Sequence, residues 1–556
     1  MLKIIYPLII LVVNIGLASS QTNNANVELL TQKIGTAKGK NKTFEQKFEQ
    51  SDQIPTVFKI TINDVEHGNE ICMMANAIDI NPSQIIFEPK KDIIEIKAQI
   101  TGGRKLIKIL ENGNSKDYIN KIIFYSSEIE EARTLKNALE EFVKTSQEKN
   151  KQQQEKDYSK QDLLELIRSN TTEVTINDDR YNQKIEVDEN NSNIIHLQRE
   201  DLSKGTKEQF QFNLADLYQS QIDFETRRNQ VFVSLNTKAG NKLIGYTKNG
   251  ETGNYTNNTE VLMPSIEIAR EYSDNLKQLI EIGENEETTD YSGYGYAECI
   301  IFLQKNIGKV DINKDTYVQS FETNTDNSYI FSITSQDVSK GVIYTYKVNA
   351  ADLKKGKTRF DSKSNAVIIE LETQDKSKLI GVSKNGDMDN YISSFIVQAP
   401  GIESARALSE VFSRFKELAR ETINDTNAFS NDNEARTFIK GAVYELVINT
   451  DTYEQSIEIS DENNCSYVYE ITDVSKNVNY RYEVNLQDVD VHKVIMDTNG
   501  PSVYVGIETK GKKKLIKSYK NGEVDKFIYQ FTILMPDIEQ ARKFVPALKT
   551  MIARCE

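Results

Sequence analysis

The chain has 556 residues, of which 38% are hydrophobic and 27% charged, and its formal net charge is −15. This composition is typical of a soluble globular protein and excludes both a disordered chain and one embedded in a membrane. A chain of this length holds several domains, and its negative charge makes nucleic acid an unfavourable partner.

The N-terminal segment has the features of a cleaved signal peptide. Lys3 supplies a short basic region, residues 4–18 are mostly apolar, and residues 18–20 are small enough for a signal-peptidase site. The alternative is an uncleaved anchor, but the apolar run is shorter than the ~20 residues that span a bilayer, and Pro7 and Asn14 interrupt it. We therefore expect cleavage near residue 20 and a secreted or periplasmic mature protein without stable membrane insertion.

The rest of the chain repeats one pattern four times. Each copy has an aromatic residue at the start of its first predicted strand, then an Asn-Gly pair, then the motif Ile-Glu-x-Ala-Arg. In every copy the glycine follows the aromatic residue by 69 positions and the arginine follows it by 89. These residues are Phe44, Tyr181, Tyr317 and Tyr453; Gly113, Gly250, Gly386 and Gly522; and Arg133, Arg270, Arg406 and Arg542. Because the spacing is constant, the copies can be compared position by position.

Within a copy, alternating apolar and polar residues predict seven strands, and a periodic apolar stripe predicts a helix after them. In the fourth copy the strands are 453–460, 466–472, 480–486, 493–497, 502–509, 514–519 and 527–535. The Asn-Gly pair between the last two favours a type I′ hairpin. Asp537 is the expected helix N-cap, and Ile538, Ala541, Val545, Leu548 and Ile552 form one apolar face. A shorter helix is expected before the second sheet, over Asp162–Ser169.

Seven antiparallel strands followed by one amphipathic helix resemble the pleckstrin-homology-like fold. The resemblance implies an α+β, mainly β fold: four tandem seven-stranded antiparallel barrels or sandwiches, each capped by its C-terminal helix. The copies are expected to occupy 26–146, 160–282, 296–421 and 434–556. The chain departs from the family pattern because it has no Trp, whereas these domains usually carry one in the helix.

The resemblance also raises the question of the partner. Phosphoinositide-binding members of the family have a basic loop between the first two strands, but here the loop is acidic. It contains Glu49 and Asp52, Asp188 and Glu189, Asp326, or Asp461 and Glu462. Because carboxylates repel phosphates, we do not expect that function. The resemblance instead implies a groove between the helix and an edge strand that binds proteins or peptides.

The cysteines do not follow the repeat. Cys72, Cys299, Cys465 and Cys555 are the four in the chain, and they lie at different places in their copies. A disulfide common to all copies is therefore not expected, and the sequence leaves open whether Cys465 and Cys555 pair.

A glutamine recurs two residues after each aromatic residue, as Gln46, Gln183, Gln319 and Gln455. Alternation along the strand places it on the same face as an apolar residue two positions later, and so pointing inward. A buried amide without hydrogen-bond partners costs about 1–3 kcal/mol. We favour a structural role, in which the amide bonds the backbone of the preceding segment or of a sheet bend. The alternative is a ligand-binding anchor at the mouth of a barrel that holds a small molecule.

Two other recurrent patterns receive structural interpretations. In Ile-Glu-x-Ala-Arg the Glu and Arg are three residues apart. An exposed ion pair at this spacing stabilises a helix by only ~0.2–0.5 kcal/mol. We expect the Arg stem to cover the open edge of the barrel rather than to contact a partner. The segment Asn-x-Asp-x-Tyr begins at Asn177, Asn313 and Asn449. Its oxygens could bind calcium, but we favour an Asx-turn before a strand, which needs no ion.

No pattern predicts catalysis. His67, His196 and His492 occupy three different places in the repeat, and no His/Cys cluster has metal-ligand spacing. The sequence also lacks a Gly-rich phosphate loop. We therefore expect no catalytic residue, no metal and no cofactor.

Taken together, these patterns predict an exported, non-catalytic scaffold of four repeats that binds protein or peptide partners. Several weak sites on one chain raise the overall affinity when they are occupied at once. The alternative is a carrier that holds a small apolar ligand inside each barrel, with the four glutamines as anchors.

Overall fold

The computed structural model describes residues 25–153, 158–286, 289–423, 429, 431–460 and 465–555. The predicted signal peptide and the loop residues Asp461 and Glu462 lie outside these ranges. No helix within the described ranges is long and apolar enough to cross a membrane. The chain divides into two compact units, Met1–Glu286 and Glu287–Glu556. Unit 1 holds repeats 1 and 2, and unit 2 holds repeats 3 and 4.

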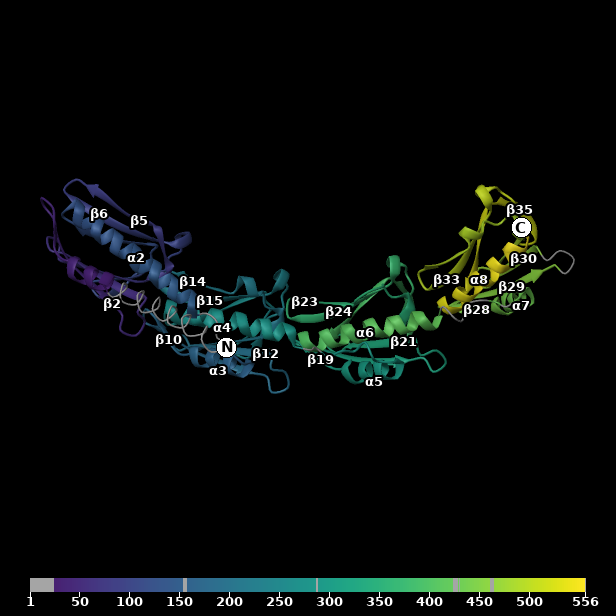
Figure 1. The fold of residues 1–556 in the computed structure, drawn as a ribbon. Coiled ribbons are helices and arrows are strands. Elements are labelled where there is room, and N and C mark those ends of the chain that lie inside the picture. Colours follow the sequence, from purple (N-terminus) through teal and green to yellow (C-terminus); the bar gives the residue numbers. More distant parts are fainter. Residues whose placement is uncertain are drawn as a thin grey trace, which may run out of the picture. The chain divides into compact units, whose positions relative to one another are not determined.

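Unit 1 contains two copies of the same order of elements (Figure 1). In repeat 1, residues 25–33 are helical. They are followed by β1 (Ala37–Lys38), β2 (Thr43–Gln50), β3 (Val57–Asp64), β4 (Asn69–Asn76), β5 (Ile80–Lys90), β6 (Ile93–Ile100), β7 (Lys108–Glu111), β8 (Asn114–Ser115), β9 (Lys121–Ser126) and α2 (Ile129–Gln153). Repeat 2 consists of α3 (Lys160–Asn170), β10 (Val174–Ile176), β11 (Asp179–Val187), β12 (Ile194–Asp201), β13 (Thr206–Asn213), β14 (Asp223–Arg227), β15 (Gln230–Asn236), β16 (Gly245–Lys248), β17 (Glu251–Thr252), β18 (Asn258–Met263) and α4 (Ile266–Asn285).

Unit 2 contains the other two copies. Repeat 3 consists of α5 (Tyr296–Asn306), β19 (Val310–Ile312), β20 (Asp315–Thr323), β21 (Ile330–Asp337), β22 (Val342–Asn349), β23 (Arg359–Lys363), β24 (Ala366–Glu372), β25 (Ile380–Lys384), β26 (Asp387–Ile392), β27 (Ser394–Ala399) and α6 (Ile402–Ile423). Repeat 4 consists of α7 (Asp432–Ala442), β28 (Leu446–Ile448), β29 (Asp451–Ile459), β30 (Ser466–Asp473), β31 (Val478–Asn485), β32 (Ile495–Asn499), β33 (Ser502–Glu508), β34 (Ile516–Lys520), β35 (Glu523–Ile528), β36 (Gln530–Met535) and α8 (Ile538–Cys555).

Each repeat forms two antiparallel sheets. In repeat 2 the larger sheet has the order β10-β11-β12-β13-β16-β17, and the smaller sheet has the order β14-β15-β18. The fold is therefore α+β and mainly β, as predicted. Both sheets are open, and no sheet in the described ranges closes into a barrel, so the sandwich form of the prediction fits and the barrel form does not. The chain leaves the larger sheet after β13, returns for the hairpin β16–β17, and then adds β18 to the smaller sheet.

All seven strands predicted for the fourth copy are present, but the described part of each repeat has nine strands. One additional strand is short and precedes the first predicted strand. The other arises because the last predicted strand, 527–535, is divided between the two sheets: β35 ends at Ile528 in the larger sheet, and β36 begins at Gln530 in the smaller one. Alternation of apolar residues continues across this break, which is why the sequence showed one strand.

The predicted turns are confirmed. Asn249 and Gly250 have φ angles of 51° and 83°, and Lys248 pairs with Glu251 across them, as a two-residue hairpin with positive φ at both central positions requires. Asn177 also has a positive φ, 54°, in a two-residue turn between β10 and β11, where Ile176 pairs with Asp179. Asn177 therefore lies in a turn before β11, and the Asx-turn hydrogen bond that we favoured stays a prediction.

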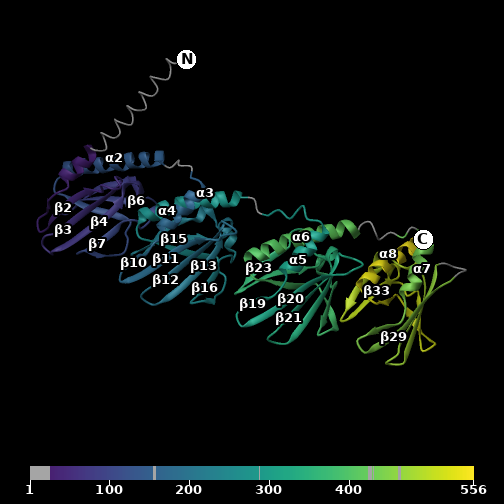
Figure 2. The same ribbon diagram turned by 90° about the horizontal axis from the view of Figure 1, so that it is seen from below.

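The core of each repeat lies between the sheets and the long helix. In repeat 1, Phe142 of α2 packs edge-on against Phe48 and Phe58, with ring centroids 6.3 and 5.8 Å apart, and all three rings are almost fully buried. Burying one such side chain stabilises the fold by about 1.5–3 kcal/mol. The shorter helix predicted before the second sheet is α3, which packs beside α4 (Figure 2). The helix cap is also confirmed, since the Gln540 N–H donates to Asp537 at 2.9 Å.

Cys465 and Cys555 form a disulfide in repeat 4. The bond joins the segment just before β30 to the end of α8, and the two residues are 90 positions apart in the sequence. Closing so long a loop restricts the unfolded chain, which stabilises the folded one. Cys72 and Cys299 are free thiols.

We expect the double variant Cys465→Ser, Cys555→Ser to lose about 2–4 kcal/mol of stability in repeat 4, because the unfolded loop regains its freedom. Hydrogen exchange of the peptides from β30 to α8 in the full chain measures this loss. Cys72→Ser is the matched control and should leave exchange in repeat 4 unchanged. Equal exchange in the double variant and the control would contradict the prediction.

Candidate functional site

The recurrent glutamine bridges the two sheets of a repeat. Gln183 lies on β11 of the larger sheet and is 4% exposed. Its Nε2 donates to the carbonyl of Leu262 at 2.8 Å, and the N–H of Leu262 donates to its Oε1 at 3.0 Å. Leu262 is on β18, the edge strand of the smaller sheet. The side-chain amide thus takes the place of a neighbouring strand at one backbone position.

The same bridge occurs in repeats 1 and 3. Gln46 bonds both backbone groups of Tyr125 at 2.9 and 2.7 Å, and Gln319 bonds both of Gln398 at 2.9 and 3.0 Å. Both amides also donate to the segment before the sheet, at the carbonyls of Gly35 and Gly308. These are the backbone partners that the structural interpretation expected.

In repeat 4 the bridge is altered. Gln455 still donates to the carbonyl of Leu534 at 3.1 Å, but its Oε1 accepts from the Tyr469 hydroxyl at 2.7 Å. The N–H of Leu534 in turn lies 3.5 Å from that hydroxyl. A tyrosine therefore stands between the glutamine and one backbone group. A ligand-binding role for the four glutamines stays a prediction, but in these contacts the amides are occupied by the protein itself.

A buried ion pair joins neighbouring repeats within each unit. In unit 1, Arg270 of α4 donates to both carboxylate oxygens of Asp79 at 2.7 Å, and Asp79 lies in the single helical turn after β4, Ala77–Asp79. In unit 2, Arg542 of α8 pairs with Asp352 in the matching turn after β22. The carboxylate side chains are each 8% exposed. We call these contacts the 1–2 junction and the 3–4 junction.

These pairs overturn one expectation. Arg270 and Arg542 belong to Ile-Glu-x-Ala-Arg, and we expected that Arg to cover the edge of its own repeat. Instead each guanidinium reaches the preceding repeat. Burial raises the pKa of both Asp79 and Asp352 above the usual value, and the arginine beside each opposes the shift. The arginines therefore compensate carboxylates that water no longer solvates.

Other contacts recur at both junctions. The Thr226 hydroxyl donates to the carbonyl of Lys105 at 2.5 Å, and the Thr498 hydroxyl donates to that of Lys378 at 3.0 Å. Lys105 and Lys378 hold the same position in their copies, as do the two threonines. The junctions are thus two examples of one interface, which always joins the same two faces of the repeat.

Sequence reasoning missed the carboxylate side of this interface. An Asp follows each aromatic residue by 35 positions, as Asp79, Asp216, Asp352 and Asp488. This recurrence was available without a structure, because acidic residues seldom repeat at a buried position unless they have a partner. What the sequence could not supply was the partner, which lies on the next repeat about 190 residues away.

A pocket of about 410 Å³ lies at the 3–4 junction. Repeat 3 contributes residues of β22, β25 and β26, and repeat 4 contributes β28, the end of β36 and the start of α8. Strands β26 and β28 are each the outermost strand of their sheet. The pocket therefore lies between two strand edges and a helix N-terminus.

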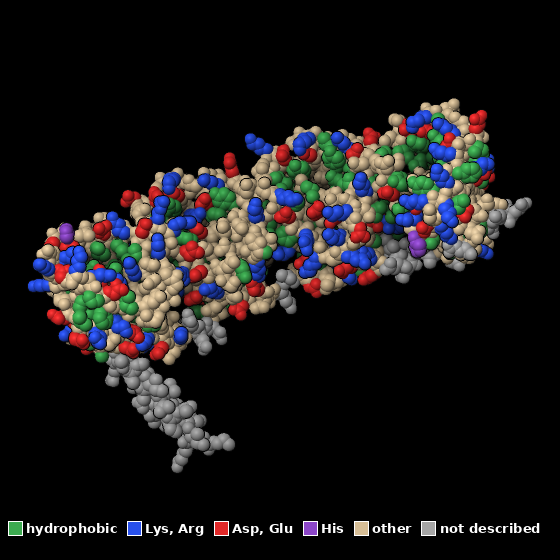
Figure 3. Space-filling view, turned by 90° about the horizontal axis from the view of Figure 1, so that it is seen from above, with side chains coloured by type: hydrophobic (Ala, Val, Ile, Leu, Met, Phe, Trp, Pro, Cys, Tyr) green, Lys and Arg blue, Asp and Glu red, His purple; other side chains and the backbone are tan. Residues whose placement is uncertain are grey.

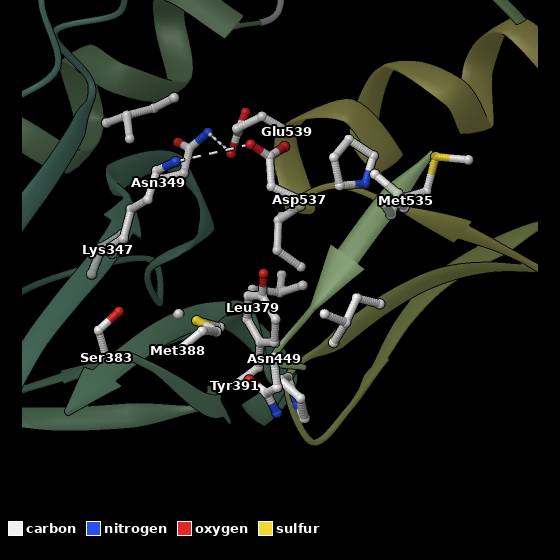
Figure 4. Close-up of a pocket in the computed structure, with 18 of the residues that line it drawn as sticks. Lys347, Asn349, Leu379, Ser383, Met388, Tyr391, Asn449, Met535, Asp537 and Glu539 are labelled. Atoms are coloured by element: carbon white, nitrogen blue, oxygen red, sulfur yellow. Dashed lines mark hydrogen bonds and ion pairs between the residues drawn. The ribbon is translucent and has the colours of Figure 1, made fainter. Parts of the chain in front are cut away.

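Polar side chains form one rim of the pocket, and Leu379, Met388 and Tyr391 form an apolar wall with Ser383 and Asn449 beside it (Figure 4). Asn349 donates to Glu539 at 3.0 Å, and Lys347 lies 3.9 Å from Asp537, so these side chains join the two repeats along one side. Met388 and Tyr391 line the opposite side. Burial and the nearby Asp537 raise the pKa of Tyr391 to about 12, so its phenol is neutral at physiological pH.

The chain was compared with protein-family models and with curated proteins. Neither comparison finds a match.

We expect Gln183→Leu to destabilise repeat 2 by about 1–3 kcal/mol, because both backbone groups of Leu262 lose a buried partner. Gln455→Leu should cost less, since the Tyr469 hydroxyl remains near Leu534. Denaturant unfolding of the full chain measures both changes. Gln161→Leu, on the exposed side of α3, is the control. If Gln183→Leu lowered the free energy of unfolding no more than Gln161→Leu does, the glutamine bridge would not stabilise the repeat.

Arg542→Ala should weaken the 3–4 junction by about 3–5 kcal/mol at pH 7, because it leaves the buried Asp352 charge uncompensated. The pKa of Asp352 then rises further above that of the unfolded chain. Stability from a carboxyl with a raised pKa is present at low pH and lost as pH rises through the folded pKa. The penalty should therefore be smaller near pH 4 than at pH 7.

Unfolding curves of Arg542→Ala and the unmodified chain at the two pH values test this expectation. Arg133→Ala is the matched control, because Arg133 holds the same motif position but its side chain is 57% exposed. It should change stability by less than about 0.5 kcal/mol. A penalty for Arg542→Ala that does not depend on pH would show that Asp352 is not the group responsible.

Proposed function

We propose that this protein is an exported, non-catalytic scaffold that binds extended segments of protein partners. The observation that carries the proposal is the pocket at the 3–4 junction, which lies between the edge strands β26 and β28 and the start of α8. An edge strand presents unpaired backbone groups, and an extended peptide can satisfy them by adding as a further strand.

The lining of the pocket suits a peptide. The apolar wall, including Leu379, Met388 and Tyr391, can take one or two side chains of a peptide. At the rim, the Lys347–Asp537 and Asn349–Glu539 contacts provide both hydrogen-bond donors and acceptors. Flexible methionine side chains adapt to different partners. An extended segment with alternating apolar and polar residues is the occupant that this pocket fits best.

The same proposal includes the family that the repeat resembles and the compartment in which the protein acts. The two sheets and the C-terminal helix support a pleckstrin-homology-like repeat. The disulfide between Cys465 and Cys555 supports export, because such bonds persist in oxidising compartments. A scaffold needs neither a metal nor a cofactor, and we propose that the protein uses none.

The rival proposal is a carrier of small apolar ligands within the repeats. In repeat 1 the packing of Phe48, Phe58 and Phe142 argues against it, because these rings contact one another and are almost fully buried. The glutamine amides argue against it as well, since backbone groups and, in repeat 4, the Tyr469 hydroxyl already occupy them. We therefore favour the scaffold.

Native mass spectrometry of the mature protein purified from its natural source distinguishes the two. A scaffold is expected to carry a protein or peptide, whereas a carrier would add a few hundred daltons per repeat. An added mass of a few hundred daltons per repeat would contradict the scaffold proposal.

The site itself can be tested with a phage-displayed library of unstructured peptides panned on the full chain. We expect Met388→Lys to weaken the selected peptides at least about tenfold, equal to ~1.4 kcal/mol, because it places a charge in the apolar wall. Ser115→Lys is the matched control, since Ser115 holds the same position at the 1–2 junction. Equal affinity for both variants would place the peptide elsewhere.

A further inference from the structure

The two ends of the repeat series expose faces that are covered at the junctions. Leu515 and Phe527 of repeat 4 are 45% and 54% exposed. Their counterparts in repeat 1, Leu106 and Tyr118, are 4% and 5% exposed and belong to the apolar cluster that runs through repeats 1 and 2. Position by position, repeat 4 therefore displays the apolar surface that repeat 1 buries against its neighbour.

Repeat 3 shows the same relation. Its residues at these two positions, Leu379 and Tyr391, pack against the core of repeat 4. Repeat 4 also carries Asp488, which matches the junction carboxylates Asp79 and Asp352. Both the apolar and the acidic parts of the covered face are thus present on the last repeat.

Repeat 1 exposes the complementary face. Ile129 is 49% exposed and the Arg133 side chain 57% exposed. At the 3–4 junction the matching residues, Ile538 and Arg542, are 6% exposed and 18% exposed in the side chain. The first repeat therefore displays the helix face that a later repeat uses to dock on its predecessor.

We propose that repeat 4 of one chain binds repeat 1 of a second copy, through the interface already seen at the 1–2 and 3–4 junctions. Ile129 then covers the surface around Leu515 and Phe527, and Arg133 pairs with Asp488. Two independent features point to this occupant: continuity with an interface that occurs twice, and opposite charge at the Arg–Asp position. The inference goes beyond the proposed peptide site and does not depend on it.

The intermolecular junction lacks the threonine contact of both internal junctions and the Lys347–Asp537 contact of the 3–4 junction. The threonine that donates to a lysine carbonyl is replaced by Pro89 in repeat 1, which has no hydroxyl. Glu483 and Glu128 occupy the positions of Lys347 and Asp537, so two like charges would meet. Without the tether of a continuous chain, these losses favour reversible association over a permanent complex.

This mode of contact is head to tail. The two faces are different, so each added chain leaves one face of each kind exposed, and the assembly grows as an open series unless it closes into a ring. A mutation on either face should stop growth, but the two mutations have complementary effects, which provides a sharp test.

Sedimentation velocity of the mature full chain over a range of concentrations tests the proposal. The weight-average mass is expected to rise with concentration. The species that form should differ from one another by the mass of one chain. Arg133→Glu and Phe527→Asp should each reduce the protein to single chains. Val474→Asp, at a site 45% exposed in the turn after β30, is the control and should assemble like the unmodified protein. Thermal unfolding should be the same for all variants, because all three residues are exposed.

Mixing the two defective variants is decisive. Arg133→Glu keeps an intact repeat 4 face, and Phe527→Asp keeps an intact repeat 1 face, so the mixture should form dimers and nothing larger. The charge exchange Arg133→Asp with Asp488→Arg in one chain should restore the longer series. Single chains at every concentration, assembly that survives both variants, or a mixture that stays monomeric would each overturn the proposal. A complex formed only with a different protein would do so as well.

Discussion

In each repeat, two open sheets meet where the edge strand of the smaller sheet has no neighbour, and the recurrent glutamine supplies one. In repeat 2 the backbone N–H and carbonyl of Leu262 point away from β15, and the Gln183 amide satisfies both. An amide side chain has one donor side and one acceptor side, as a peptide group does. The glutamine therefore continues the strand ladder for one position and ties the larger sheet to the smaller one.

With the sheets joined, the long helix can close the core, and its first turn becomes available for docking. The arginine near the start of α4 or α8 reaches the preceding repeat, where a single helical turn holds a buried carboxylate. A buried pair of this kind contributes little net stability but is costly to break. It thus fixes which faces meet, while the apolar contacts around it supply most of the attraction.

The polarity of this interface links the architecture to the proposed activities. Because the 1–2 and 3–4 junctions both join a helix face to a sheet face, further docking of the same kind leaves a different face exposed on each of the two partners. At the 3–4 junction the same arrangement brings two strand edges together around a pocket. Peptide binding and self-assembly would then be two uses of one repeating geometry.

Local sequence patterns specify the repeats, their register, the seven main strands, the Asn-Gly hairpins and the helix caps. These features depend on residues close together in the sequence, through alternation, turn conformations and capping. They can therefore be predicted without knowing the tertiary contacts. The sequence also predicted that the recurrent glutamine points inward; Gln46, Gln183 and Gln319 are buried, while Gln455 is half-buried. The folded chain adds three features: the strand at 527–535 divides between two sheets, the sheets stay open, and Arg542 reaches Asp352. Each of these depends on groups that meet across long stretches of chain, where a recurrent residue reveals its importance but not its partner.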